Sequence, residues 1–383
     1  MLWPRHLNSV FASISSSPSS KSHCNAHSRR EKLTSNLIAL AFTTTILQWF
    51  HENGRALPWR ETRDPYAIWL LEIILQQTRI EQGRPYWERF MQRWPTVQDL
   101  AAALEDEVLR EWQGLGYYSR ARNLHTAAKQ ITAQGGFPTT LSGLKALKGV
   151  GDYTAAAIGS IAFDLPAAVV DGNVYRVLSR HYGIATPINT TEGKKEFTAL
   201  AQSLVSRLSV NPGASGLSEV SAFNQAMMDF GAIQCTPQSP LCPRCPLSET
   251  CIALREGRIN DLPVKLKTLK VKERHLTYTY IRCHGETAIH RRPAGDIWQG
   301  LYEPWLVADD TSGSSQRSGV PSGAVLLRQN VKHVLTHRVL HADFWLWEVQ
   351  EKPALPEDYF WIAEADIDQY GVPRLIELLL EEL

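Results

Sequence analysis

The sequence predicts two folded parts, a mainly helical domain followed by a smaller α+β domain. The chain has 383 residues, which is more than one hydrophobic core usually supports. From Asn36 to about Cys251, apolar residues recur at spacings of three and four, as they do in helices that bury one face. After residue 275 the pattern changes to short runs of aromatic and β-branched residues, which are typical of strands.

Residues 1–35 precede the helical pattern. The first 30 residues lack Asp and Glu, are rich in Ser and carry Arg5, Lys21, Arg29 and Arg30, a composition found in organelle transit peptides. A disordered extension or a misassigned start explains the same composition, and the absence of a clean hydrophobic segment argues against a secretory signal. No apolar run approaches the roughly 20 residues of a membrane span, so no membrane association is expected.

The helical domain is expected over residues 36–256, with helices in segments such as 37–50, 65–78 and 108–112. The second segment contains one acidic residue, Glu72, within the apolar run LLEIILQQT. Ile68 precedes Glu72 by four residues and Leu75 follows it by three, so a helix places all three on the apolar face. A carboxyl there is a salt-bridged structural acid, an exposed residue of a short helix, or a group held in a dry pocket for proton transfer.

The segment LKGVGDYTAAAI, residues 147–158, predicts a tight bend between two helices. Gly149, Val150 and Gly151 form the bend, and an Ala-rich helix follows. Consecutive backbone N–H groups at such a bend, with a helix N-terminus behind them, can bind a phosphate. The segment therefore looks like a helix-hairpin-helix clamp for a DNA backbone, although a plain turn with helix-capping glycines has the same residues.

The segment VVDGNVYRVLSR, residues 169–180, places Asp171 just ahead of a helix that begins near Asn173. Asp is a common N-cap, so a capping role explains this position. Alternatively, Asp171 stays ionised at a catalytic centre while Glu72 is dry and protonated. Two carboxyls in such opposite environments suit acid-assisted departure of a group from a sugar through an oxocarbenium-like transition state.

Four cysteines lie within seventeen residues, in the order Cys235, six residues, Cys242, two residues, Cys245, five residues, Cys251. This density without a secretory signal favours a metal centre over disulfides. Four thiolates suit a [4Fe-4S] cluster or zinc, and the spacing alone does not distinguish the two.

A basic linker is expected at residues 257–274, where Lys265, Lys267, Lys270, Lys272 and Arg274 alternate with apolar or small residues. The C-terminal domain is expected over residues 275–383, with strands that begin at Leu276, Glu286 and Ala342. A last helix, residues 373–382, opens with Pro and carries its apolar residues on one side.

These motifs closely resemble those of the MutY-type adenine DNA glycosylases, in the endonuclease III superfamily. The resemblance rests on LPWR, DPYAIWLLEIILQQTRI, WQGLGYYSRARNLH, LKGVGDYTAAAI, VVDGNVYRVL and the cysteine spacing, and it spans Asn36 to the C-terminus. It implies a mainly α helix-hairpin-helix glycosylase domain with a [4Fe-4S] loop, followed by an α+β Nudix-like domain. The implied substrate is double-stranded DNA with adenine opposite 8-oxoguanine or guanine. The implied reaction is hydrolysis of the N-glycosidic bond after base flipping.

In this family the acid at the position of Glu72 protonates the adenine ring, and the carboxylate at the position of Asp171 stabilises the sugar cation. Asn173 and Tyr153 line the same pocket. The sister family, endonuclease III, has a lysine at the position of Tyr153, which forms a Schiff base and then cleaves the strand. Tyrosine cannot do this, and DGN in place of DTH points the same way, so a monofunctional enzyme is expected.

The resemblance also assigns residues that would contact DNA and the cofactor. Gln77 and Tyr117 match residues that wedge into the duplex, and Trp59 and Arg60 border the adenine pocket. Gly149, Val150 and Gly151 would hold a phosphate, and Cys235, Cys242, Cys245 and Cys251 would ligate a [4Fe-4S] cluster.

The C-terminal domain would recognise 8-oxoguanine, and residues 291–305 fit its first strands and loop. No glutamate-rich metal-binding helix follows GLYE, so this module is expected to read the base without hydrolysing nucleotides. The family's probing loop usually reads Phe-Ser-His, whereas this chain has Leu335, Thr336 and His337. Thr336 keeps a hydroxyl for hydrogen bonding, but Leu335 cannot stack as an aromatic ring does.

Two other interpretations fit the same motifs. One is an endonuclease III-like or thymine mismatch glycosylase, and the other is a catalytically silent DNA-binding protein with a structural cluster. The presence of both Glu72 and Asp171 argues against the second. We expect a monomer in the bacterial cytoplasm at the nucleoid, with organelle targeting by residues 1–30 as the alternative, and a linker available to a replication or repair partner.

Overall fold

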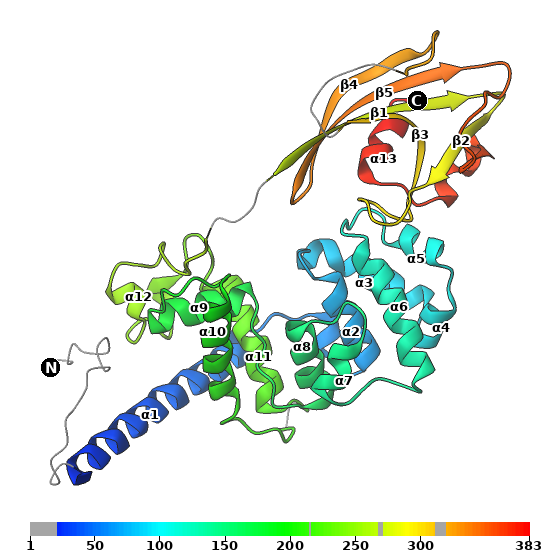
Figure 1. Ribbon diagram of the computed structural model, residues 1–383. Helices are drawn as coiled ribbons and strands as arrows, with labels where there is room; N and C mark the ends of the chain where they lie inside the picture. The colour runs from blue at the N-terminus through cyan, green and yellow to red at the C-terminus, as the bar shows by residue number, and fades with distance from the viewer. Residues whose placement is uncertain (1–20, 214–215, 267–270, 311–318) are drawn as a thin grey trace.

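The computed structural model describes residues 21–213, 216–266, 271–310 and 319–383, which form two helical lobes and a sheet domain (Figure 1). Residues 1–20 of the predicted extension lie outside the described residues. Residues 21–35 form the first turns of helix α1 (Lys21–Asn53), so this helix begins well before the helix expected over residues 37–50. None of the described helices combines the length and hydrophobicity that crossing a membrane requires.

The first helical lobe comprises the elements between Pro58 and Phe163. They are η1 (Pro58–Arg60), α2 (Pro65–Ile74), α3 (Ile80–Arg93), α4 (Val97–Ala102), α5 (Glu105–Glu111), α6 (Ser119–Ala133), α7 (Leu141–Ala146) and α8 (Asp152–Phe163). Their apolar faces meet in one core. Helix α2 starts sharply because Asp64 caps its first turn and Pro65 occupies its first position. Almost all of α2 is apolar and buried, which carries Glu72 into the interior.

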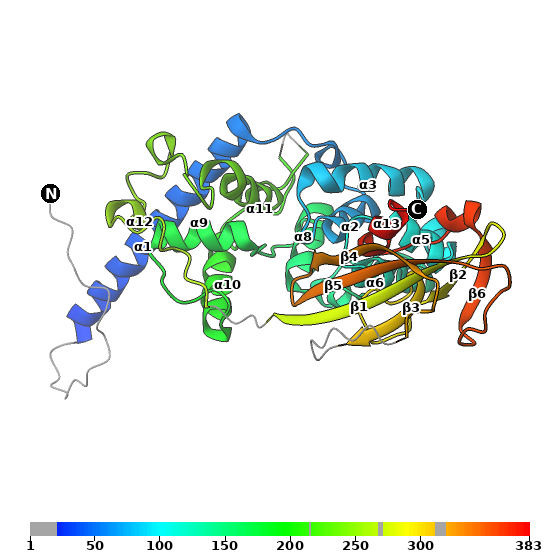
Figure 2. The same ribbon diagram turned by 90° about the horizontal axis from the view of Figure 1, so that it is seen from above.

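The second helical lobe combines α1 with the elements after residue 171. They are α9 (Gly172–Tyr182), α10 (Thr191–Val205), α11 (Glu219–Asp229), the π-helical turn η2 (Phe230–Gln234), η3 (Cys242–Arg244) and α12 (Ile252–Arg255). Helix α1 packs on α11, and Figures 1 and 2 show it on the side away from the sheet domain. A small cluster that includes Ala157 and Val169 joins the two lobes between α8 and the segment leading to α9.

The sheet domain contains six strands in the order β4-β5-β1-β3-β2-β6. The strands are β1 (Lys272–Arg282), β2 (Glu286–Arg291), β3 (Tyr302–Asp310), β4 (Val325–Val334), β5 (Arg338–Glu348) and β6 (Tyr359–Ala363). β1 and β5 are parallel, and the other neighbours are antiparallel. After η4 (Glu364–Gln369), helix α13 (Arg374–Leu380) packs its apolar residues into the core of this domain.

The predicted strands at Leu276, Glu286 and Ala342 are confirmed within β1, β2 and β5, and the predicted last helix is confirmed as α13. The chain after GLYE continues as β3, and residues 311–318 lie outside the described residues. Residues 267–270 of the expected linker also lie outside them, whereas Lys272 and Arg274 belong to β1.

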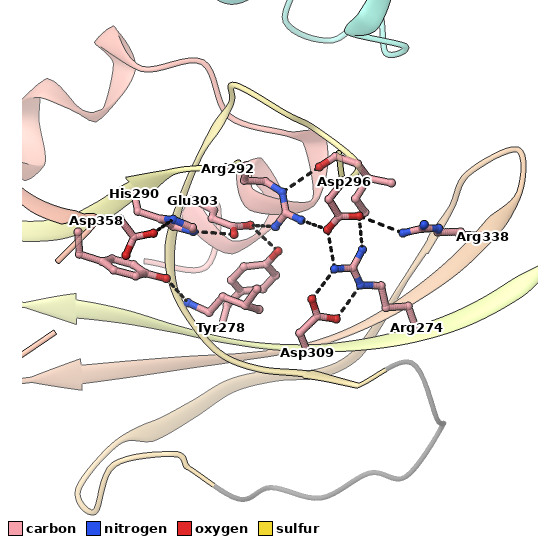
Figure 3. A network of polar contacts seen from close by, with 12 residues as sticks. Arg274, Tyr278, His290, Arg292, Asp296, Glu303, Asp309, Arg338 and Asp358 are labelled. Atoms are coloured by element: carbon pink, nitrogen blue, oxygen red, sulfur yellow. Dashed lines mark hydrogen bonds and ion pairs between the residues drawn. The ribbon is translucent and has the colours of Figure 1, made fainter. Parts of the chain in front are cut away.

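A polar network lies inside the sheet domain (Figure 3). Its centre is the Glu303 carboxylate, which is 1% exposed and accepts hydrogen bonds from Arg292 at 2.5 Å and Tyr278 at 2.7 Å. His290 lies between two carboxylates, with Nε2 at 2.9 Å from Glu303 and Nδ1 at 3.1 Å from Asp358. Buried charges persist in proteins where partners satisfy them in this way.

The same network fixes the loop of residues 293–300. Asp296 in this loop pairs with Arg274 and Arg292, each at 2.6 Å, and with Arg338 at 3.1 Å. Arg274, which the sequence suggested as a linker cation, is therefore a buried structural residue. Its burial follows from its place at the start of β1, beside β3 and β5.

The sheet domain contacts the first helical lobe at α5 and at residues that follow it, such as Gln113 and Arg122. Arg291 pairs with Asp106 of α5 at 2.7 Å, and the Tyr302 hydroxyl donates to the same carboxylate at 2.9 Å. Next to these polar contacts, Leu301 is fully buried in the core of the first lobe. The two domains thus share an apolar contact as well as surface ion pairs.

Candidate active site and DNA-binding surface

Glu72 lies near the end of α2, with its side chain inside the protein. The residue is 7% exposed, and it forms no ion pair within the described part of the chain. Burial raises the pKa of Glu72 from its ordinary value of 4.5 to about 7. A hydrogen bond from Tyr153 partly opposes this shift, and the nearby Asp171 carboxylate adds to it. Of the three interpretations of Glu72, its position matches the dry carboxyl and excludes the salt-bridged and exposed ones.

Tyr153 comes from the first turn of α8 and reaches both lobes. It donates a hydrogen bond to Glu72, and its hydroxyl lies 3.5 Å from the sulfur of Met228 on α11. Burial raises the pKa of Tyr153 well above its ordinary value, and the neighbouring carboxylates add to the effect. The hydroxyl therefore stays protonated at neutral pH, where it serves as a hydrogen-bond donor to a carboxyl.

Asp171 is the N-cap of α9, so the capping interpretation is correct. Its side chain accepts a hydrogen bond from the backbone N–H of Val174 at 2.8 Å and one from Asn173 Nδ2 at 2.7 Å. Burial raises the pKa of Asp171, while these hydrogen bonds and the Arg176 guanidinium lower it. Capping also fixes the carboxylate at the entrance to α9, next to Glu72.

Asn173 is held in turn by Arg176. The Arg176 guanidinium donates to Asn173 Oδ1 at 2.8 Å and to the carbonyls of Gly231 at 2.7 Å and Cys235 at 2.7 Å. Because the Asn173 oxygen is occupied by Arg176, its NH₂ group is oriented toward Asp171. This series of hydrogen bonds, from Arg176 through Asn173 to Asp171, thus orients the Asp171 carboxylate.

The two carboxyls have different partners although burial affects both. Asp171 receives hydrogen bonds from a helix N-terminus and an amide, which favour its ionised form. Glu72 receives one from Tyr153 and has an anionic neighbour, and this combination leaves it with a pKa about 7. The two carboxyls thus differ in their hydrogen-bond partners, and the roles of proton donor and anion stay a prediction for this pair.

Trp59 and Arg60 lie in η1, which contacts α2. Trp59 is buried edge-on against Trp87, with ring centroids 5.8 Å apart. Arg60 pairs at 2.9 Å with Asp229 of α11, whose side chain is fully buried. The guanidinium of Arg60 thus forms a structural ion pair, and its place at the border of an adenine pocket stays a prediction.

Gln77 and Tyr117 share an unusual backbone conformation. Gln77 follows α2 and has a backbone φ of 57°, and Tyr117 precedes α6 and has a φ of 49°. Both values lie in the left-handed region that residues other than glycine rarely adopt. Both side chains are exposed, and Tyr117 is 48% exposed. Non-glycine residues held in this region cluster at ligand-binding sites. The structure therefore presents the two predicted wedge residues from two constrained loops.

Gly149, Val150 and Gly151 form the bend between α7 and α8. Gly149 has φ 80°, and an added Cβ would lie 2.8 Å from Asn123 Cβ, so the bend requires glycine there. Val150 anchors the bend in the core at 7% exposed. Among the described residues, no acceptor bonds the N–H groups of Gly149 and Gly151. These free donors beside the N-terminus of α8 match a phosphate-binding hairpin.

The four cysteines of the predicted metal centre follow η2 and precede α12, and none forms a disulfide. Burial raises the pKa of Cys242, Cys245 and Cys251, that of Cys245 to about 11, and the other thiols of the set act in the same direction. Arg180 Nη1 lies 3.5 Å from Cys235 Sγ. Within the described residues, however, no group of three or more His, Cys, Asp or Glu side chains is arranged to hold a metal ion.

Thr336 and His337 lie at the tip of the hairpin formed by β4 and β5. Both are exposed, whereas Leu335 packs against the core of the sheet domain. The Thr336 hydroxyl lies 2.5 Å from the Tyr117 hydroxyl, across the domain boundary. The hairpin tip of the sheet domain and a wedge loop of the helical domain therefore meet at one hydrogen bond.

The sequence did not indicate two residues that contact this site. Met228 touches Tyr153, but a methionine in a helix has no local signal that separates it from core. Arg120 contacts both loops that carry the predicted wedge residues. The signal that could have found it is a basic residue at the helical spacing of the buried face of α6. Both contacts join segments that are far apart in the chain.

Models of two known protein families match this chain, one in the helical part and one in the sheet domain. A model described as "HhH-GPD superfamily base excision DNA repair protein" matches residues 70–206, and a model described as "NUDIX domain" matches residues 277–382. These ranges cover most of α2 to α10 and nearly all of the sheet domain.

Two curated relatives share the description "Adenine DNA glycosylase". The protein from Buchnera aphidicola subsp. Schizaphis graminum is 35% identical over 264 residues, which is 68% of this chain and 73% of that protein. The protein from Rattus norvegicus is 43% identical over 237 residues, 58% of this chain but 44% of the rat protein. This chain therefore spans less than half of that mammalian relative.

Among solved structures, a thermostable thymine-DNA glycosylase is similar in fold. It is 31% identical, superposes with a TM-score of 0.52, and the match covers 58% of this chain and 99% of that one.

Proposed function

Since this chain belongs to the adenine DNA glycosylase family of base excision repair enzymes, we propose that it removes adenine paired with 8-oxoguanine or guanine. It acts as a monomer on double-stranded DNA and hydrolyses the N-glycosidic bond. The observation that carries the proposal is the buried Glu72 carboxyl, with a pKa about 7, beside the capped Asp171 carboxylate.

Glu72 is the general acid. With a pKa about 7 it is protonated in about half of the molecules at pH 7, so it can donate a proton to a ring nitrogen of adenine. The protonated base then departs as a neutral molecule instead of an anion, which lowers the barrier to breaking the glycosidic bond. The hydrogen bond from Tyr153 on α8 helps to hold the Glu72 carboxyl in place during this transfer.

Asp171 stabilises the sugar as the base leaves. Positive charge develops on the ring in an oxocarbenium-like transition state, and an oriented carboxylate next to it lowers the energy of that state. Val174 N–H and Asn173 fix the orientation in advance, so little reorganisation is needed. A water molecule then adds to the sugar and completes hydrolysis.

The enzyme is monofunctional. Strand cleavage by the lysine route needs an amine that attacks the sugar and forms a Schiff base. Tyr153, buried and protonated, supplies no amine at this position. The product is therefore an intact strand with an abasic site.

Gln77 and Tyr117 support extrusion of the base. An exposed amide and an exposed ring on two constrained loops can occupy the space that a flipped nucleotide vacates. The free N–H groups of Gly149 and Gly151 bind a backbone phosphate close to α8, which carries Tyr153. Trp59 supports the base pocket from η1, and Arg60 supports it indirectly through Asp229.

The hairpin tip of the sheet domain reads the base opposite the adenine. The Thr336 hydroxyl and the His337 ring are exposed there and can hydrogen bond to 8-oxoguanine. Contact with Tyr117 brings the tip next to a wedge residue.

Cys235, Cys242, Cys245 and Cys251 would hold a [4Fe-4S] cluster. Four thiols near one loop are the donors that such a cluster takes, and the cationic Arg180 beside Cys235 suits its negative charge. The bound cluster would order the loop of residues 235–251 and supply no step of the hydrolysis.

A mismatch panel tests the proposal. Labelled duplexes carry adenine opposite 8-oxoguanine, guanine, cytosine or thymine, and a further duplex carries thymine opposite guanine. We expect alkali-sensitive sites at adenine opposite 8-oxoguanine and guanine, and intact strands without alkali. Thymine release would favour the second candidate, a thymine mismatch glycosylase, which the likeness to the thermostable thymine-DNA glycosylase supports.

A further inference from the structure

Arg120, the second residue of α6, is a buried cation without an acidic partner. It is 8% exposed, and it makes no ion pair with any described residue. Burial lowers its pKa to about 10, so the guanidinium remains charged at neutral pH. A buried charge needs compensation from nearby dipoles when no counter-ion is present. The contacts of Arg120 therefore indicate what its charge stabilises.

One edge of the guanidinium holds the end of α2. Nη1 donates to the carbonyls of Ile73 at 3.1 Å, Ile74 at 2.8 Å and Gln76 at 2.5 Å. The last carbonyls of a helix lack partners within the helix and carry the negative end of its dipole. Arg120 thus fixes the turn that leads from Glu72 to Gln77.

The other edge contacts both the loop after α2 and the loop before α6. Nη2 donates to Thr78 Oγ1 at 3.3 Å, and it lies 3.5 Å from the carbonyl of Leu115 and 3.4 Å from that of Gly116, at the outer limit of hydrogen bonding. The guanidinium carbon also lies 5.6 Å from the centre of the Tyr117 ring. One side chain therefore contacts both loops that carry the exposed wedge residues.

These two loops contain Gln77 and Tyr117 in the left-handed region. Such conformations persist only where the surrounding structure holds them, because each carries a conformational cost. The planar guanidinium of an arginine can donate hydrogen bonds to two groups of carbonyls at a fixed separation, whereas a lysine has a single ammonium group. Arginine therefore suits a position from which one residue contacts both loops.

We infer that Arg120 is a positioning residue that locks the Gln77 and Tyr117 loops together, so that the two side chains enter DNA as one unit. The inference deepens the proposed function and rests on it. Tyr117 also contacts Thr336, so the lock connects the hairpin tip of the sheet domain to the end of the helix that carries Glu72.

The first test uses the free protein and does not depend on activity. Hydrogen–deuterium exchange is compared for wild type, Arg120→Met and Arg120→Lys in peptides covering residues 75–78 and 113–118. The amides of Thr78 and Leu115 are hydrogen bonded to Leu75 and Trp112, so they report opening of each loop. Arg120→Met should exchange at least about tenfold faster in both peptides, and peptides from α10 should not change.

Arg120→Lys distinguishes a forked lock from a simple buried charge. We expect lysine to restore protection in one of the two peptides and not in both. Arg89→Met is the matched control, because Arg89 also contacts a carbonyl, that of Glu111 at 3.0 Å, and a ring, that of Tyr86, without touching either loop. Unchanged exchange in Arg120→Met, or full restoration by lysine, would overturn the inference.

The second test measures entry into DNA. A 2-aminopurine flanking the pair of adenine and 8-oxoguanine brightens when wedging disrupts its stacking. The signal of Arg120→Met should fall to that of Gln77→Ala combined with Tyr117→Ala, while Arg89→Met matches wild type. A wild-type signal from Arg120→Met refutes the lock. If wild type releases no adenine, the proposed function fails, but the exchange experiment still decides whether Arg120 holds the loops.

Discussion

Replacing Glu72 with glutamine removes the proton and keeps the shape of the side chain. Glutamine can still accept a hydrogen bond from Tyr153, so the pocket should stay intact. Adenine release should fall by several orders of magnitude because an amide cannot act as the acid, a role that contributes roughly 10²–10⁴-fold on its own. Binding of duplex DNA should remain near that of wild type.

The pH dependence gives the same prediction a second, quantitative form. With a pKa about 7, Glu72 is protonated in about half of the molecules at pH 7 and in roughly a tenth at pH 8. Single-turnover adenine release by wild type should therefore decline about tenfold per pH unit above pH 8. The residual activity of Glu72→Gln should lack this decline.

The free energy of unfolding should also depend on the protonation of Glu72. The folded protein binds this proton more tightly than the unfolded chain does, because the folded pKa is raised from 4.5 to about 7. This stabilisation is fully present below pH 4.5 and is lost as the pH rises through about 7. At about 1.4 kcal/mol per pH unit, the free energy of unfolding of wild type relative to Glu72→Gln should drop by about 3 kcal/mol between pH 4.5 and 8.

Both quantities are measured on the same two proteins. Denaturant unfolding followed by tryptophan fluorescence gives the stability difference, and single-turnover assays with adenine opposite 8-oxoguanine give the rates. Glu88→Gln, at an exposed site on α3, is the matched control for loss of a carboxylate. If Glu72→Gln retains wild-type rates, or if the stability difference does not change with pH, the assignment of Glu72 as a dry acid is wrong.

Three further predictions concern the rest of the molecule. Thr336→Ala removes a hydroxyl from the hairpin tip, so the preference for 8-oxoguanine over guanine opposite adenine should fall several-fold, measured as a ratio of single-turnover rates; an unchanged ratio would exclude a reading role for Thr336. Cys245→Ser should yield protein with less bound iron and weaker visible absorption than wild type, whereas Cys283→Ser, at a buried site in the sheet domain, should retain both. Glu303→Ala leaves Arg292 buried without its 2.5 Å partner, so the sheet domain should lose about 3–5 kcal/mol of stability in denaturant unfolding, and a loss below about 1 kcal/mol would contradict this account of the network.

The main parts of the catalytic geometry follow from local rules. The helical period of LLEIILQQT places Glu72 on a buried face, and its high pKa is a direct result of that burial. Asp171 follows from the preference of Asp for helix N-caps. Both positions depend on residues within one or two turns, which is the range over which sequence patterns are informative.

The roles of other residues depend on ion-pair partners that lie far away in the chain, which a local sequence pattern cannot indicate. Arg60 was expected to border the adenine pocket, and its guanidinium also pairs with Asp229 on α11. Arg274 was expected in a basic linker, but it lies in β1, where its guanidinium pairs with Asp296 and Asp309. For both residues, the partner that binds the guanidinium lies far away in the chain.

The burial of Leu301 in the core of the first helical lobe has a consequence for dissecting the protein. A version truncated within the linker would keep both Glu72 and Asp171, yet it would lose Leu301 and expose the apolar surface that Leu301 covers on the first lobe. Such a fragment should be less soluble and less stable than the catalytic half within the whole chain. The first helical lobe thus takes part of its core from a residue of the neighbouring domain.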